Sequence, residues 1–66
     1  MKNELKITFE GGNWFYFKTH QETADKAFQD FEETLDNAGI NTDNINYKEA
    51  ILRNSTGEDI DRISFT

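Results

Sequence analysis

The chain has 66 residues, of which thirteen are acidic and seven basic, with a formal net charge of −6 at pH 7 and no cysteine. This length suffices for a single small globular domain, residues 1–66, and the lack of cysteine excludes disulfides and thiolate metal sites. Because phosphate backbones repel a net negative chain, direct binding to duplex nucleic acid is disfavoured.

No stretch of the chain approaches the ~20 consecutive apolar residues of a membrane span, and the N-terminus shows no apolar run typical of a secretion signal. We therefore expect a cytoplasmic protein that does not bind membranes, with a processed secreted form as the alternative. In a cytoplasmic protein the sequon Asn54-Ser55-Thr56 is predicted to be a turn rather than a glycosylation site.

The N-terminal third of the chain predicts a β-hairpin. Residues 4–10 alternate apolar and polar side chains, residues 14–19 are rich in aromatic and β-branched side chains, and Gly11-Gly12-Asn13 joins the two runs. We expect two antiparallel strands that bury their apolar face.

The register of this hairpin follows from its apolar residues. If Phe9 lies opposite Phe15 and Ile7 opposite Phe17, across a loop in which Asn13 is left-handed, all four side chains share one face. A two-residue Gly-Gly turn would reverse the faces. We favour the first register because it builds a core opposite the helix that follows.

This register leaves four residues together on the outer face of the sheet: Lys6, Trp14, Tyr16 and Lys18. Large aromatic side chains can simply shield the hydrogen bonds of a strand pair. Trp and Tyr are also the residues most enriched at interface hot spots, so the same face is a candidate binding surface.

The segment from Thr19 to Gly39 predicts an amphipathic helix over about residues 20–38. The motif Thr19-His20-Gln21-Glu22 fits a capping box, so the helix is expected to begin near His20. Gly39 suits the left-handed residue that follows a helix, so the helix is expected to end near Ala38.

The two faces of this helix differ sharply. The apolar face, which we expect to pack on the core, consists of Ala24, Ala27, Phe28, Phe31, Leu35 and Ala38. The opposite face is acidic and is our first candidate for a partner-binding site, formed by Asp25, Gln29, Glu32, Glu33 and Asp36. Seven of the thirteen acids lie between residues 20 and 43, where Lys26 is the single base.

The C-terminal third predicts a second hairpin. Residues 59–66 read as a strand, whereas residues 45–53 fit either a strand, which we favour, or a short helix. The chain is thus an α+β protein, a ββαββ two-layer sandwich with the helix on a four-stranded sheet. A crossover of this kind lets the first and last strands pair in the middle of the sheet.

This layout resembles the immunoglobulin-binding domains of streptococcal protein G and of protein L. The stretch Thr23-Ala24-Asp25-Lys26-Ala27-Phe28 is similar to the start of the helix in those domains. The resemblance implies the architecture alone, because the third strand has no Trp and no binding positions match residue by residue.

The sequence contains no catalytic motif, so we expect a protein that is not an enzyme and needs no cofactor or metal. His20 is the one histidine and is expected to be exposed. The oxygen-rich stretch 36–43 lacks the alternate spacing of a calcium-binding loop, which indicates a helix end followed by a turn.

Two functional hypotheses follow from these surfaces. The first is a small inhibitor or accessory protein, of the kind often encoded by phages and mobile elements, whose acidic helix docks on a basic protein and mimics nucleic acid. The basic partner would itself be a nucleic-acid-binding protein. In the second, the outer sheet face binds single-stranded nucleic acid or protein, or that face or the edge of the third strand forms a homo-oligomer.

Overall fold

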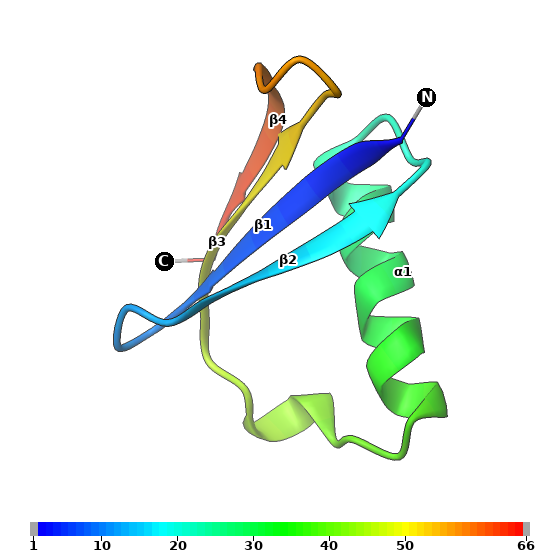
Figure 1. Ribbon diagram of the computed structural model, residues 1–66. Helices are drawn as coiled ribbons and strands as arrows, with labels where there is room; N and C mark the ends of the chain where they lie inside the picture. The colour runs from blue at the N-terminus through cyan, green and yellow to red at the C-terminus, as the bar shows by residue number, and fades with distance from the viewer. Residues whose placement is uncertain (1, 66) are drawn as a thin grey trace.

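The computed structural model describes residues 2–65, which form two layers, a four-stranded antiparallel sheet and one helix packed on it (Figure 1). In chain order the elements are β1 (Asn3–Phe9), β2 (Trp14–Thr19), α1 (Ala24–Asn37), the short 3₁₀ helix η1 (Thr42–Asn44), β3 (Tyr47–Arg53) and β4 (Asp59–Ser64). The predicted α+β ββαββ fold is therefore confirmed. Within the stretch 45–53, for which the sequence allowed a strand or a short helix, the strand β3 (Tyr47–Arg53) forms.

The order of strands in the sheet differs from the prediction. The strands lie in the order β2-β1-β3-β4, so β3 rather than β4 pairs with β1 in the middle, and β2 and β4 form the edges. Since β2 and β3 both run antiparallel to β1, they are parallel to each other and need a crossover, which α1 provides. The resemblance to the protein G and protein L domains thus extends only to the order of elements along the chain.

The first hairpin has the predicted faces but not the predicted register. Ile7 lies opposite Phe15, and Leu5 lies opposite Phe17. The predicted pairing of Phe9 with Phe15 is wrong by two residues. A shift of two residues leaves every side chain on its expected face, because strand side chains alternate with a period of two.

The loop of this hairpin explains the shift. Gly11 and Gly12 both have positive φ, and no residue other than glycine does so between residues 2 and 65. The two glycines thus take the left-handed conformations that we had expected at Asn13. The turn closes one residue earlier, where the N–H of Phe9 donates to the carbonyl of Asn13 at 2.8 Å.

The core lies between the sheet and α1. Leu5 and Ile7 of β1 and Leu52 of β3 are completely buried at its centre. The helix contributes four buried residues from its predicted apolar face, Ala24, Ala27, Phe28 and Phe31. Leu35 is only partly buried and Ala38, beyond the helix, is exposed.

The helix begins four residues later than predicted. Thr19 ends β2 opposite Asn3, and its hydroxyl accepts a hydrogen bond from the N–H of Gln21 at 3.1 Å. The pairing with β1 holds Thr19 in the strand, where it cannot cap a helix. Thr23 is the N-cap instead, and its hydroxyl accepts from the N–H of Lys26 at 3.3 Å.

The end of the helix is close to the predicted position. The N–H of Ile40 donates to the carbonyl of Leu35 at 2.9 Å, and the N–H of Gly39 donates to that of Asp36 at 3.0 Å. Gly39 has a φ of 81°, so these bonds form the Schellman ending that a left-handed glycine allows.

A residue from β4 completes the start of α1. The carboxylate of Asp61 accepts a hydrogen bond from the N–H of Ala24 at 2.7 Å, at the positive end of the helix dipole. This bond and a second one from the N–H of Arg62 hold the pKa of Asp61 below its usual value of about 3.8. Asp61 therefore links the last strand to the helix.

This link gives a pH-dependent prediction. Because the pKa of Asp61 is lower in the folded state, its carboxylate stabilises the fold fully above the unfolded pKa, and the effect is lost as pH falls through the folded pKa. We expect Asp61→Ala to lower the free energy of unfolding near pH 7, and to lower it by progressively less as the pH falls below the usual pKa of about 3.8. Urea unfolding across this range measures the difference.

The variant Asp61→Asn is the matched control, since it retains an acceptor oxygen without the charge. Its loss near neutral pH should be smaller than that of Asp61→Ala. A loss for Asp61→Ala that is the same at both ends of the pH range would show that the charge of Asp61 does not act on the helix.

Candidate functional site

The predicted acidic face is present along α1. Asp25, Gln29, Glu33 and Asp36 are exposed, and Glu32 is half-buried. At about 100° per residue, Asp25, Glu32 and Asp36 lie within about 40° of one another around the helix axis. These three carboxylates therefore form a row along one side of the helix.

The acids of the strands, in contrast, have partners. Three ion pairs join strand residues: Glu4 to Lys18 at 2.9 Å, Asp59 to Arg53 at 2.9 Å, and Glu49 to Arg62 at 2.7 Å. The remaining strand acid, Asp61, binds the start of α1. Within residues 2–65, the helix acids Asp25, Glu32, Glu33 and Asp36 form no ion pair. With five acids and one lysine, α1 has a net charge of −4 out of the total of −6.

The acids at the C-terminal end of α1 do not serve the helix. Asp36 lies in the last turn of the helix, and Glu33 lies directly before that turn. The last turn contains no basic residue. A carboxylate at the negative end of the helix dipole is unfavourable. Helix stability therefore does not account for these two acids.

Tyr47 lies close to the acidic row, on the core side of β3. Its hydroxyl is buried and forms no hydrogen bond with any residue that the structure describes. Burial raises the pKa of Tyr47 above 10.0, and the negative charges of Glu32 and Asp36 raise it further. Tyr47 therefore stays protonated at neutral pH beside the acidic row.

The second candidate surface, on the outer face of the sheet, is also assembled as predicted. Lys6 lies opposite Tyr16, and its Nζ atom is 5.6 Å from the centre of the Trp14 ring. Lys18 lies on the same face, where Glu4 binds it. Lys6 and Trp14 thus form a cation–π pair between the neighbouring strands β1 and β2.

The outer face is less basic than the sequence suggested. Arg62 donates a hydrogen bond to Glu49, which lies opposite Thr8 on the same face. The guanidinium of Arg62 holds the pKa of Glu49 below its usual value, so the carboxylate stays charged beside its partner. The bases of this face are therefore largely matched by acids.

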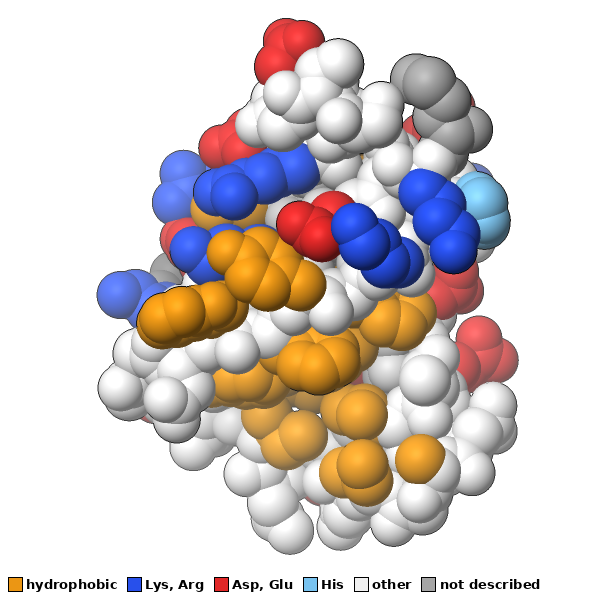
Figure 2. Space-filling model, in the orientation of Figure 1, with side chains coloured by type: hydrophobic (Ala, Val, Ile, Leu, Met, Phe, Trp, Pro, Cys, Tyr) orange, Lys and Arg blue, Asp and Glu red, His pale blue; other side chains and the backbone are white. Residues whose placement is uncertain are grey.

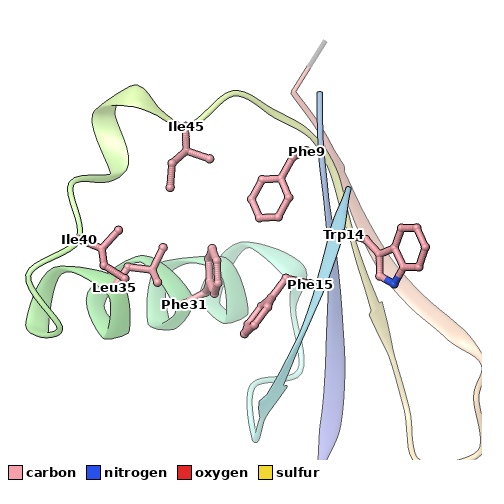
Figure 3. Close-up of a pocket in the computed structure, with 7 residues that line it drawn as sticks. All are labelled: Phe9, Trp14, Phe15, Phe31, Leu35, Ile40 and Ile45. Carbon is pink, nitrogen blue, oxygen red and sulfur yellow. The ribbon is translucent and has the colours of Figure 1, made fainter. Parts of the chain in front are cut away.

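The structure adds an apolar groove that the sequence had not indicated. It has a volume of about 240 Å³ and lies between the first hairpin, the C-terminal half of α1 and the connection that follows the helix (Figure 3). Its lining residues are Phe9, Trp14, Phe15, Phe31, Leu35, Ile40 and Ile45. In Figure 3 the Trp14 ring points to the opposite side of the sheet from the other six labelled side chains.

The groove opens to solvent. Phe15 is 49% exposed and Ile40 is 48% exposed. Figure 2 shows hydrophobic side chains gathered across the middle and lower part of this face, with Lys and Arg side chains above them. One feature of the sequence could have indicated this groove. Two apolar residues, Ile40 and Ile45, flank the polar connection after the helix, although a solvent-exposed turn does not require apolar side chains.

The groove lies in an acidic part of the chain. The two segments that enclose it, residues 9–15 and 31–46, contain five acids and no base. An approaching basic group therefore meets only carboxylates on these segments. The acidic face and the groove share the C-terminal half of α1, so one partner can contact both.

Within residues 2–65, no helix is both long enough and apolar enough to cross a bilayer. Comparison of the chain with protein-family models, with curated proteins and with solved structures finds no match.

Proposed function

We propose that the protein is a non-catalytic binding module that docks on a basic surface of a partner protein through the acidic face of α1. The observation that carries this proposal is the separation of charge. Strand acids are bonded to bases or to the start of α1, whereas Asp25, Glu32, Glu33 and Asp36 form no ion pair with any residue from 2 to 65.

The row of carboxylates contributes electrostatic attraction to a basic partner. Unpaired charges on one face raise the rate of association with an oppositely charged surface and make it sensitive to salt. Asp25, Glu32 and Asp36 are fixed on a rigid helix, with about 6 Å between the last two along the axis. Such a row can occupy a surface built to bind phosphates, which makes an inhibitor of a nucleic-acid-binding protein the most direct use.

The groove supplies the anchor. Apolar side chains that enter well-packed pockets dominate binding energy, and charges around them mainly set orientation and rate. Ile40 and Leu35 offer such a pocket at the end of the helix that carries the acids. The preferred partner therefore presents basic residues beside an exposed apolar side chain.

The proposal is tested with a synthetic amphipathic peptide of Lys and Leu, whose affinity is measured by calorimetry. We expect the combined variant Asp25→Lys, Glu32→Lys and Asp36→Lys to bind it at least ~10-fold more weakly than the wild type, because the row is then basic. Binding by the wild type should weaken from about 0.1 M to about 1 M salt, as charges become screened.

The matched control reverses three acids elsewhere, with Glu4→Lys, Glu22→Lys and Glu58→Lys. Both combined variants change the net charge from −6 to 0, so a general effect of net charge is equal in the two. The control should lose much less affinity than the helix variant. Equal losses would show that the acidic face is not a binding site.

A further inference from the structure

The edge formed by β2 is open and unprotected. No strand between residues 2 and 65 pairs with its outer side, and Figure 1 shows β2 at the margin of the sheet. Trp14, Phe15 and Tyr16 are 59%, 49% and 45% exposed. Exposed edge strands with large apolar side chains are the ones that pair with another chain.

The other edge, β4, carries the features that prevent pairing. It contains Asp59, Asp61 and Arg62, and its register with β3 is interrupted near Arg53. Charged side chains and irregular registers are the usual protection of sheet edges. In β2, Lys18 is the single charged residue, and the β1–β2 register has no interruption.

The hydrogen-bonding groups of the open edge can be assigned from the ladder. The N–H of Phe9 donates to the carbonyl of Asn13, so the backbone of Asn13 faces β1. Groups that face the same way recur every second residue along a strand, so Phe15 and Phe17 also bond to β1, in hydrogen-bonded pairs with Ile7 and Leu5. The N–H and C=O groups of Trp14, Tyr16 and Lys18 consequently point away from β1. These three residues form the free edge.

We infer that β2 pairs with β2 of a second copy of this chain, antiparallel and centred on Tyr16. In this register Tyr16 lies opposite Tyr16 of the second copy, and Trp14 lies opposite Lys18 of the second copy. All three edge residues of each copy then exchange backbone hydrogen bonds. No other register centred on one residue of β2 uses all of them.

The side chains are self-complementary in this register. On the outer face Lys18 of one copy meets the Trp14 ring of the other, a cation–π pair rather than a pair of like charges. On the core face the half-exposed Phe15 meets Phe17 of the second copy, in the closely spaced type of pair that favours aromatic contacts.

The distribution of charge favours a second copy at this edge. The β1–β2 hairpin, residues 3–19, contains two lysines and two glutamates, so two such edges meet without a concentration of acids. The two-fold axis of the pair is perpendicular to the sheet, which leaves both α1 helices on the same face. The dimer therefore presents two acidic faces together.

The first test is sedimentation of the native chain and of two variants at position 14. The wild type should sediment at twice its mass of 7.7 kDa. Trp14→Lys sets a lysine against Lys18 of the second copy, whereas Trp14→Glu sets a glutamate there, and both variants lose the same exposed ring. We expect Trp14→Lys to dimerise at least ~10-fold more weakly than Trp14→Glu, since each change occurs twice in the dimer.

The second test is cross-linking, for which the natural chain offers a clean background because it has no cysteine. Tyr16→Cys should form an intermolecular disulfide under mild oxidation, since Cα atoms of a hydrogen-bonded antiparallel pair lie about 5.5 Å apart. Thr8→Cys, on the same face but on β1, should not. Sedimentation of the wild type as a monomer at all attainable concentrations would overturn the inference, and so would equal dimerisation of the two position-14 variants.

Discussion

Replacement of Phe28 by alanine is expected to lower the free energy of unfolding by about 3–5 kcal/mol. Phe28 is 8% exposed, and its ring centre lies 4.8 Å from that of Tyr47 and 4.8 Å from that of Phe65. The truncation leaves a cavity where α1 meets β3 and β4. Because a chain of this length has a total stability of about 3–10 kcal/mol, the variant should be largely or partly unfolded near physiological temperature.

Thermal and urea unfolding measure this loss, and Phe65→Ala is the control. Phe65 belongs to the same aromatic cluster but is 39% exposed, so its removal should cost only about 1–2 kcal/mol. A loss below about 1 kcal/mol for Phe28→Ala would mean that the helix does not pack on the sheet as described.

Replacement of Leu52 by alanine is expected to cost about 2–5 kcal/mol. Leu52 is completely buried in β3 and lies opposite Leu5 of β1, at the centre of the core. Its neighbour Ile51 lies on the outer face of the sheet, opposite Lys6, and is only half-buried. Ile51→Ala should therefore cost about 1 kcal/mol.

The pair of variants also tests the structure of the stretch that the sequence left ambiguous. In a strand, adjacent residues face opposite sides, so the two losses must differ. Urea unfolding of both variants gives the comparison. Similar losses at the two positions would contradict the strand and favour the short helix that the sequence also allowed.

Patterns confined to one element were predictable from the sequence. The alternation of residues 4–10 and the helical spacing of Ala24, Ala27, Phe28 and Phe31 identified the buried faces correctly, because a side chain's face depends only on its own element. The end of the helix was predictable for the same reason. Gly39 is the one glycine near that end, and a left-handed glycine stops a helix locally.

Features that depend on distant contacts were not predictable. The start of α1 is set by Asp61 from β4 and by the pairing of Thr19 with Asn3, neither of which a local motif encodes. The central pairing of β1 with β3 likewise has no local sequence signal. Both C-terminal strands have apolar residues on one face, so the sequence does not show which of them pairs with β1. The register predicted for the first hairpin was wrong because two adjacent glycines permit more than one type of turn.

The two kinds of candidate surface differ in the same way. The acidic face was visible in the sequence because Asp25, Glu32 and Asp36 belong to one helix. The groove was not visible because Phe9, Phe15 and Ile45 reach it from separate elements. The sequence also could not show which acids form ion pairs. The structure shows that Glu4, Glu49 and Asp59 of the strands do, whereas the acids of the helix row do not.

The binding surface itself is most directly located by nuclear magnetic resonance. Isotope-labelled protein is titrated with the amphipathic Lys and Leu peptide, and the shifts of the backbone amides are followed. The largest shifts should fall on exposed residues of α1 from Asp25 to Asp36 and on Ile40 and Ile45 beside the groove. Shifts centred on Lys6 and Tyr16 instead would contradict the proposed acidic site and assign binding to the outer face of the sheet.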